Sequence, residues 1–583
     1  MARQKFLSLA TLVLTASLGC HGTIGDETGE GPGPKPGPGP KPGPMGAGGD
    51  SGAGNRGGPV GPGGSGGGSV TPPPMGDPLA AGAMPLRRLT RREYNNTLRD
   101  LLGDTANRAD NFPADKDSEF LFRRSQVVSS SDADALEGAA EATAAALASK
   151  ITQLAPCVGM AEDACARKFV VDFGLRAFRR PVEVDEGNRL MGLYTTGRTA
   201  LGLDYQGTIQ LMIEAMLQSP AFLYHWELGN GLPLVEGKVV RLNGYETASR
   251  LSYTIWGSMP DPMLFDAAKA DALKTADQVQ AQAKRMLGDM RARDTIAGFA
   301  EEWLNLDQIS ERPKDAMVYP EWNDALKAAM SGELRSFISN VVFDGDGRFT
   351  SLLMGTNSYV NQPLAAIYGV RGVTGTNMTP TMLDSNQRAG LLTRAGFLAV
   401  TGATNGSHPI KRGHKIHERL LCLTLPPPPN NVPPAKPPTA SGTTRQHVEE
   451  HDKMPCAVAC HSIMDPIGFA FEHYDGIGRY RDQDNGKPVD STGSIELDGA
   501  KKPFTDARSL SEVLSASTEV SQCLATQILR YAFKRNDAEA DRASLEAMDA
   551  SFAKGNSVTD LIVALTGTRS FRYRTPGTGE KLQ

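Results

Sequence analysis

The sequence predicts a mainly α-helical, multi-module body that follows a disordered linker rich in glycine and proline. After residue 79, apolar residues recur at helical spacing behind capping residues through most of the chain, and no segment shows several alternating strands. Residues 31–78 contain 19 glycines and 13 prolines among 48 positions. Such a segment cannot bury a core, so we expect residues 21–78 to form a disordered tether.

The first helix of the body shows the helical pattern clearly. Thr90 and Glu93 form a capping box, in which the Thr90 hydroxyl accepts the Glu93 amide and the Glu93 carboxylate reaches back to the Thr90 amide. Gly103 ends the helix. Apolar side chains between them recur at helical spacing, at Leu89, Tyr94, Leu98, Leu101 and Leu102.

Later segments follow the same pattern with three exceptions. A short strand is expected at 238–242, and polar turns are expected at 482–499. Residues 426–438 are rich in proline and predict an extended loop. Helices are expected at 134–155, 164–179, 206–224, 243–256, 275–292, 293–308, 323–342, 508–535, 538–554 and 557–566.

The N-terminus has the features of an export signal. Arg3 and Lys5 precede an apolar stretch at 6–18, which is shorter than the roughly 20 residues that a spanning helix needs. Gly19 before Cys20 resembles a lipoprotein cleavage site, so we expect Cys20 to be lipidated. The alternative is simple cleavage nearby, with Cys20 lost or left unmodified. We expect an exported protein held to a membrane by its N-terminal lipid, in the periplasm or on the outer cell surface.

Composition and short motifs argue against several classes of function. The formal net charge of -5 over 583 residues is small, so no nucleic-acid partner is expected. An aromatic content of 6% argues against a large aromatic sugar-binding platform. The chain contains no G-x-S-x-G, no G-x-x-x-x-G-K-[ST] and no H-E-x-x-H, so short motifs give no support to a hydrolase or a nucleotide-binding protein.

The most informative motif is residues 456–461, which read Cys-Ala-Val-Ala-Cys-His. They form a variant of the C-x-x-C-H signature of c-type haem attachment, with three residues between the cysteines instead of two. In that signature two thiols bind the haem vinyl groups, and the histidine is the proximal iron ligand. We therefore predict haem c, with Cys460 as covalent anchor, Cys456 as a second one and His461 as the iron ligand.

The extra residue leaves several alternatives open. On a 3.6-residue helix it rotates Cys456 by about 100° relative to Cys460. Cys460 alone could then form one thioether, or the two cysteines could form disulfides or remain buried thiols. A zinc site is a further alternative, with Cys456, Cys460, His461 and His451 as ligands.

The other cysteines suit disulfides. In an oxidising compartment, Cys157 with Cys165 and Cys422 with Cys523 are reasonable pairs, although spacing does not fix the connectivity.

Polar residues near the motif have alternative roles. The basic pair Lys411 and Arg412 could bind haem propionates or form a salt-bridge cluster at a helix start. Asp465, Glu472 and Asp475 could orient a ligand, bind calcium or move protons, but caps and Asx-turns are the simpler explanation. A sixth iron ligand is not determined by the sequence, and the residues weighed for it are His408, His414, His417, His447, His451, Met464 and Met548.

Several sequence blocks resemble one family. They include 87–97 (RRLTRREYNNT), 173–181 (FGLRAFRRP), 218–224 (QSPAFLY), 249–256 (SRLSYTIW), 409–413 (PIKRG), Cys460-His461 followed by 464–469 (MDPIGF), and 471–480 (FEHYDGIGRY). Together they resemble the modular exported proteins of planctomycetes and myxobacteria, built of consecutive domains of unknown function that include planctomycete cytochrome C-type domains. The resemblance implies an exported, haem-bearing protein. Family members usually carry C-x-x-C-H, from which this chain departs.

The expected organisation combines these features. The function expected first is a surface-tethered, c-type cytochrome-like protein that transfers electrons with a redox partner protein or uses its haem for oxidation. The alternatives are a polysaccharide- or protein-binding surface module held by disulfides, and an extracellular polymer-degrading enzyme.

The expected segments are a signal peptide at 1–20, a tether at 21–78, helical domains at 79–150, 151–230 and 231–370, a cytochrome c-like domain at 371–480 and a C-terminal helical domain at 481–583.

Overall fold

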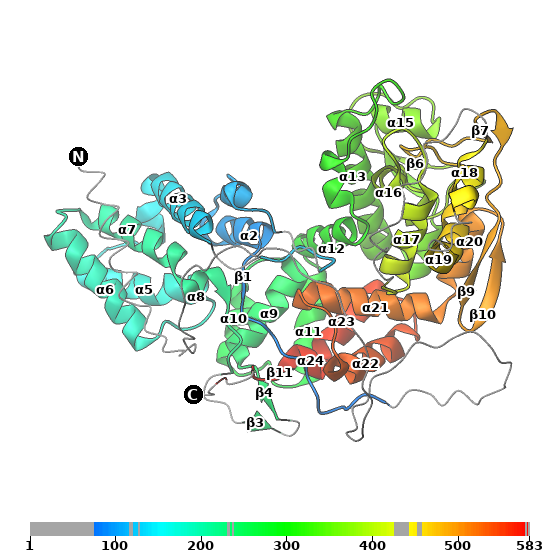
Figure 1. Cartoon of the computed structure of the whole chain (residues 1–583). Coiled ribbons are helices and arrows are strands. Elements are labelled where there is room, and N and C mark those ends of the chain that lie inside the picture. Colours follow the sequence, from blue (N-terminus) through cyan, green and yellow to red (C-terminus); the bar gives the residue numbers. More distant parts are fainter. Residues whose placement is uncertain are drawn as a thin grey trace, which may run out of the picture. The chain divides into compact units, whose positions relative to one another are not determined.

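The computed structural model describes residues 75–115, 120–125, 129–229, 234–235, 238–424, 442–451, 458–577 and 580. The side chains of 451 and 458–460 lie outside this description, as do Cys20 and Cys456. Residues 75–583 form one unit, which is mainly α-helical as the sequence predicts (Figure 1). Within the described residues, every helix is too short or too polar to cross a membrane.

The first part of the body is a helical bundle around its own apolar core. Its elements are β1 (Arg87–Arg88), α2 (Arg91–Leu102), η1 (Arg108–Asn111), α3 (Ser130–Ala146), η2 (Ala148–Lys150), α4 (Ile151–Leu154), α5 (Glu162–Phe178), α6 (Val184–Thr199), α7 (Tyr205–Gln218), α8 (Pro220–Leu223) and β2 (Tyr224–His225). The predicted capping box of α2 is present, and Gly103 ends the helix with a φ of 69°. The core includes Tyr94, Phe222 and Met212.

The middle part of the chain is also mainly helical. Its elements are β3 (Leu234–Val235), β4 (Val239–Arg241), α9 (Gly244–Trp256), α10 (Pro262–Lys269), α11 (Ala276–Leu287), α12 (Met290–Trp303), η3 (Leu306–Glu311), α13 (Asp324–Ser339), η4 (Asn340–Asp344), α14 (Phe349–Met354), β5 (Asn357–Val360) and α15 (Gln362–Tyr368). A second apolar core includes Phe120 and Phe122 and then residues from Ala248 to Phe571, so the middle and C-terminal parts share one core.

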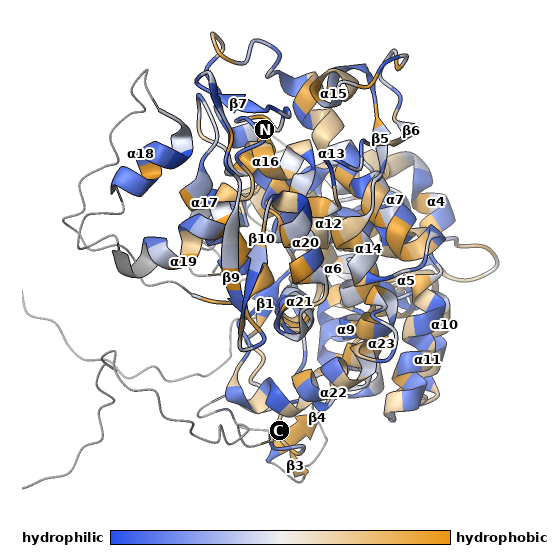
Figure 2. Ribbon diagram, turned by 90° about the vertical axis from the view of Figure 1, so that its right-hand side faces the viewer, coloured by the Kyte–Doolittle hydropathy of each residue, from blue (hydrophilic) through white to orange (hydrophobic). Residues whose placement is uncertain are grey.

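The last part contains the cysteine–histidine motif. Its elements are β6 (Thr379–Met382), η5 (Leu391–Thr393), α16 (Ala395–Thr401), α17 (Pro409–Leu420), α18 (Thr444–His451), α19 (Val458–Phe469), β7 (Gln483–Asp484), β8 (Lys487–Pro488), β9 (Gly493–Leu497), β10 (Ala500–Phe504), α20 (Ala507–Ser515), α21 (Thr518–Phe533), η6 (Glu539–Asp541), α22 (Arg542–Phe552), α23 (Val558–Gly567), α24 (Arg569–Arg572) and β11 (Tyr573–Arg574). Helix α16 is buried along its whole length and is strongly hydrophobic in Figure 2.

One expectation for this part is wrong. Residues 482–499 do not form only polar turns, because β7 pairs with β8 and β9 pairs with β10, both antiparallel. The turn between β9 and β10 consists of Asp498 and Gly499, with φ angles of 52° and 72°. Positive φ at both central residues matches the right-handed twist of the strands, which is why Asp-Gly is a strong hairpin signal.

Two contacts join residues far apart in the sequence. Strand β11 pairs with β4, which places the end of the described chain beside the start of the middle part. The guanidinium of Arg250, which is 3% exposed, donates to the carbonyls of Ser570 and Phe571 and forms an ion pair of 2.6 Å with Glu227. A buried guanidinium needs such partners, so these contacts hold α9 against the C-terminal helices.

The expected cysteine pairs are disulfides in the structure. Cys157 is bonded to Cys165, and Cys422 is bonded to Cys523, 101 residues further on. The second bond joins the residue after the C-cap of α17 to α21. It therefore ties the motif-bearing part of the chain to the C-terminal helices.

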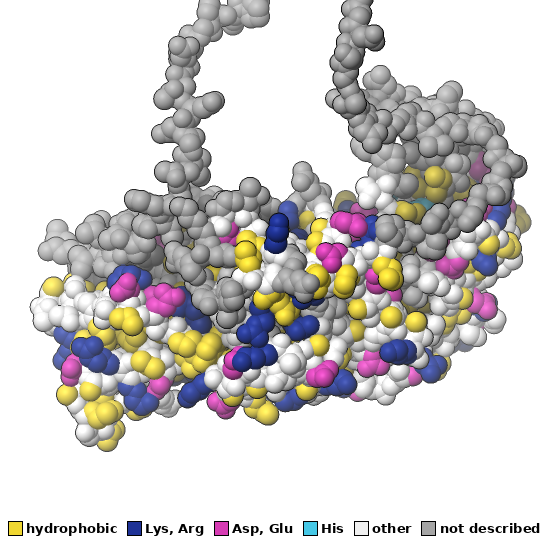
Figure 3. Space-filling view, turned by 90° about the horizontal axis from the view of Figure 1, so that it is seen from below, with side chains coloured by type: hydrophobic (Ala, Val, Ile, Leu, Met, Phe, Trp, Pro, Cys, Tyr) yellow, Lys and Arg dark blue, Asp and Glu magenta, His cyan; other side chains and the backbone are white. Residues whose placement is uncertain are grey.

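The surface shown in Figure 3 is mixed in charge. Where Figure 3 describes this face, it carries lysine and arginine side chains together with aspartate and glutamate side chains, among scattered apolar groups. A surface of this kind agrees with the small net charge of the chain.

Candidate functional site

Helix α19 carries the part of the predicted site that the structure describes. Its backbone includes Cys460 and His461 near the N-terminal end. Cys456 and the side chain of Cys460 lie outside the described residues, so the two predicted covalent anchors stay predictions. His461 is described and is 14% exposed at its side chain.

Helix α19 is held by an unusually close contact with α17, which lies beside it in Figure 1. A Cβ atom added to Gly413 of α17 would lie 2.0 Å from the carbonyl oxygen of Met464. A Cβ atom added to Gly468 of α19 would lie 2.0 Å from the carbonyl oxygen of Pro409. Because glycine has no side chain, the two backbones touch, and this contact fixes the position of α19.

The imidazole of His461 is oriented by a carboxylate one turn along the same helix. Its Nδ1 lies 2.9 Å from Oδ2 of Asp465, and Asp465 is 1% exposed. A carboxylate bonded to one ring nitrogen fixes the ring and raises the basicity of the other, as is common for histidines that ligate metals. The arrangement of His461 and Asp465 therefore fits a histidine that would ligate a haem iron.

Asp465 contacts the imidazole of His461, whereas the other two acidic residues of the segment, Glu472 and Asp475, have other partners. Asp475 forms the expected Asx-turn, because its Oδ1 accepts the amides of Ile477 and Arg479 at 3.0 and 2.8 Å. Glu472 is 2% exposed and accepts hydrogen bonds from Ser407 and Arg481. Burial raises the pKa of Glu472, while Arg412 and Arg481 act against this shift. The simpler explanation from the sequence holds for Asp475 and not for Asp465.

The prediction that Arg412 could bind haem propionates is wrong. Arg412 is fully buried, and its guanidinium donates to the carbonyls of Phe471, Tyr474 and Asp475 at 2.7–3.0 Å. It therefore fixes the loop after α19. Lys411 instead donates to the carbonyl of Val400.

Burial and neighbouring cations lower the pKa values of the basic groups at the start of α17. The pKa of Lys411 falls to about 8, and that of His408 falls to about 4. Lys314 donates to the carbonyls of Ala399 and Ala403, and its pKa falls to about 7. These lysines bind carbonyls at and just after the C-terminal end of α16, where cations are favoured.

The residues weighed as a sixth ligand are not gathered at one place by any described contact. Met548 lies in the main apolar core and is fully buried. His408 caps α17 through its Nδ1. His417 is 3% exposed, and its Nε2 lies 3.2 Å from the carbonyl oxygen of Ile463, so it contacts α19 directly. The side chain of His451 lies outside the described residues.

A metal cluster is not apparent in the part of the chain that the structure describes. No group of three or more histidine, cysteine, aspartate or glutamate side chains there could hold a metal ion. The zinc alternative is not tested by this finding, because Cys456 and the side chains of Cys460 and His451 lie outside that part.

Comparison with models of protein families shows the class of protein to which the chain belongs. Five family models match consecutive segments, each described as a protein of unknown function: DUF1587 at 87–149, DUF1595 at 165–227, DUF1592 at 242–370, DUF1588 at 388–484 and DUF1585 at 500–571. The model at 388–484, named PSCyt3, is a planctomycete cytochrome C domain, and it includes α16–α19. No curated protein and no solved structure matches the chain.

The family follows from the order of these matches. The chain belongs to the modular planctomycete-type proteins that are built of consecutive domains of unknown function.

Proposed function

We propose that this chain is a c-type cytochrome-like protein with haem c attached at the Cys460–His461 segment, and that it transfers electrons with a redox partner protein. The observation that carries the proposal is the hydrogen bond between His461 Nδ1 and the buried carboxylate of Asp465. The name of the family model that matches 388–484 gives independent support.

Each residue has a defined part in this proposal. Cys460 and Cys456 would hold the haem through thioethers, and His461 would ligate its iron. Asp465 holds the imidazole and increases its donor strength. Gly413 and Gly468 hold α19 in place. The haem, when bound, supplies a one-electron couple whose potential depends on its axial ligands and their hydrogen bonds.

The first prediction concerns covalent haem. In a host with a c-type maturation system, the wild-type chain is expected to give a pyridine haemochrome spectrum after denaturation and acid–acetone extraction. Cys460→Ala is expected to lose the covalent haem. Cys456→Ala is expected to keep it with a shifted α-band, because one vinyl group is then unreacted.

Substitutions of two acidic residues, Asp465 and Asp482, test whether Asp465 controls the ligand strength of His461. Asp465→Asn is expected to keep covalent haem but to raise the reduction potential, because a weaker acceptor at Nδ1 makes His461 a poorer donor to the oxidised iron. Asp482→Asn is the control, since Asp482 is 83% exposed at its side chain and belongs to no contact of His461 that the structure gives. A wild-type chain without covalent haem, beside a control cytochrome that matures, would contradict the proposal.

We also propose that the chain is exported and anchored to a membrane through a lipid on Cys20. The support is the signal-like sequence at 1–20. Mass spectrometry of the mature N-terminus is expected to show Cys20 as the first residue with a diacylglycerol group, and Cys20→Ser is expected to release the protein from membranes. A mature N-terminus without lipid would exclude the anchor and leave the haem proposal untouched.

A further inference from the structure

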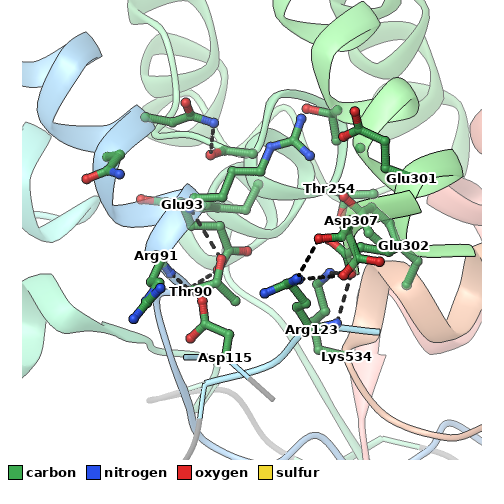
Figure 4. A pocket seen from close by; sticks show the side chains of 18 of the residues that line it. Thr90, Arg91, Glu93, Asp115, Arg123, Thr254, Glu301, Glu302, Asp307 and Lys534 are labelled. Atoms are coloured by element: carbon green, nitrogen blue, oxygen red, sulfur yellow. Dashed lines mark hydrogen bonds and ion pairs between the residues drawn. The ribbon is translucent and has the colours of Figure 1, made fainter. Parts of the chain in front are cut away.

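A cavity of about 440 Å³ lies between α2, α9, α12, η3 and the end of α21, and Figure 4 shows part of its lining. Most of the charged side chains there already have partners of opposite charge. Asp307 accepts a hydrogen bond of 2.7 Å from Arg123, and Nζ of Lys534 lies 3.8 Å from Oε2 of Glu302. Because its charges are paired with one another, the lining selects no class of ligand.

The three-stranded sheet of β3, β4 and β11 carries, in contrast, a cluster of cations around one aromatic ring. Arg241 of β4 is paired with Tyr573 of β11, so the two side chains lie on one face of the sheet. The guanidinium carbons of Arg569 and Arg572 lie 4.4 and 5.5 Å from the centre of the Tyr573 ring. All four side chains belong to partly exposed residues. We call Arg241, Arg569 and Arg572 the arginine cluster.

The charges of the arginine cluster repel one another. Burial lowers the pKa of Arg572, and Arg569 and Arg241 act in the same direction, whereas Tyr573 acts against this shift. Among the residues that the structure describes, Arg572 donates to two backbone carbonyls, and neither it nor Arg241 forms an ion pair with a carboxylate. An anion at this surface would therefore relieve a repulsion that the chain itself leaves in place.

An exposed apolar edge lies on the same sheet. Strand β3 is an edge strand, and its two residues, Leu234 and Val235, are 51% and 37% exposed. Val235 is paired with Val239, two residues before Arg241, so it lies on the same face of the sheet as Arg241. Exposed aliphatic side chains beside an aromatic ring and several cations are typical of protein surfaces that lie in the interface of a lipid bilayer.

The predicted tether joins the body beside the arginine cluster. The amide of Gly76 donates to the carboxylate of Glu546, and the carbonyl of Leu79 accepts a hydrogen bond of 2.7 Å from Nε of Arg569. Gly76 and Leu79 are three residues apart in the sequence, which is at most about 11 Å of chain. A lipid anchor at Cys20 would therefore hold the body by a point close to these cations.

The tether also makes a weak contact with the membrane sufficient. As a flexible coil, residues 21–74 would span about 40 Å. A body confined by such a linker meets the surface at an effective concentration on the order of millimolar. A surface of only millimolar affinity would then be occupied for much of the time.

We propose that the arginine cluster and the edge strand β3 form a surface that binds the anionic lipid headgroups of the membrane to which the chain is anchored. This inference rests on the proposed lipid anchor at Cys20. Lipid phosphates would accept hydrogen bonds from the guanidinium groups, and Leu234 and Val235 would enter the boundary between headgroups and acyl chains. An acidic protein could also neutralise the arginines, but the membrane is the partner that the tether brings to this point.

The test uses residues 21–583, exported behind a cleavable signal peptide so that the disulfides form and no lipid is attached. This chain keeps the whole body, which is one unit with its own cores. Flotation measures its binding to vesicles of phosphatidylcholine and phosphatidylglycerol in a two-to-one ratio, beside vesicles of phosphatidylcholine alone. The chain is expected to bind the mixed vesicles at least tenfold more tightly.

Three substitutions and one control locate the binding surface. Arg241→Gln and Arg572→Gln are each expected to weaken binding to the mixed vesicles about fivefold, through the loss of one cation. Leu234→Asp is expected to weaken it at least as much, because it removes an apolar group and adds an anion. Arg371→Gln is the matched control, because Arg371 is exposed just after α15, at the end of the molecule opposite β4 in Figure 1, and it is expected to bind as the unchanged chain does.

Thermal melting separates lost binding from lost folding. Arg241→Gln is expected to melt as the unchanged chain does, since the Arg241 side chain forms no described hydrogen bond. The proposal is overturned if the unchanged chain binds both kinds of vesicle equally or neither kind, or if Arg241→Gln and Leu234→Asp bind as it does. It is also overturned if polyglutamate binds at the arginine cluster and the mixed vesicles do not. Since the tested chain has no lipid, none of these results bears on the anchor, which the mass spectrum of the mature N-terminus decides.

Discussion

Gly413→Ala is expected to lower the free energy of unfolding by about 2–3 kcal/mol, because the new Cβ atom overpacks a backbone contact. The Cβ atom would lie 2.0 Å from the carbonyl oxygen of Met464, and a backbone atom cannot turn away as the end of a side chain can. Helices α17 and α19 must therefore separate. Denaturant unfolding of the apoprotein measures the loss.

A second glycine provides the control for this substitution. Gly138 lies within α3, and a Cβ atom added there would meet nothing within 4 Å. Gly138→Ala is expected to raise the free energy of unfolding by about 0.5–1 kcal/mol, because alanine favours the helix. Equal effects of the two substitutions would show that the contact between α17 and α19 is not tight.

Glu333→Ala is expected to cost about 3–5 kcal/mol, since it leaves a buried arginine without its counter-ion. Glu333 is fully buried in α13. Its carboxylate accepts hydrogen bonds from Ser358 at 2.6 Å, Tyr368 at 2.7 Å and Arg394 at 3.1 Å. Arg394 is 3% exposed, so its charge would keep only the carbonyls of Gly355 and Asn357.

The same substitution at a surface pair should have little effect. Glu449 forms an i,i+4 ion pair with Arg445 and is 47% exposed at its side chain. Such exposed pairs contribute about 0.3–0.5 kcal/mol. If Glu333→Ala and Glu449→Ala changed the denaturation midpoint equally, the buried network would not be the source of stability that we describe.

The helices were predictable where their signals are local. The capping box of Thr90 and Glu93 lies within four residues, and the structure contains it. The hairpin of β9 and β10 also has a local signal, Asp498-Gly499, but its strands are polar and short, so the segment resembles a loop. Helix α16 gives little amphipathic pattern because it is buried on all sides.

Some residues of the candidate site and of the cavity have a local signal in the sequence, and others have none. His461 is identified by its neighbour Cys460, and Asp465 lies one helical turn away, a spacing that the sequence displays. Lys534 and Asp307 have no such signal. They line the same cavity only because α21 packs against α12, and no short-range pattern in the sequence indicates that packing.

The pairing of β4 with β11 and the contact of Arg250 with Ser570 can form only after the C-terminal segment has been synthesised. Arg250 is separated by 320 residues from Ser570, whose carbonyl it binds. At about 5–20 residues per second, a nascent chain would need about 15–60 s to reach that partner. During this interval Glu227, only 23 residues before Arg250, can already neutralise the guanidinium. This early ion pair would limit the time for which a charge destined for the interior has no counter-ion, whereas the docking of the last helix and strand must wait for translation to pass them.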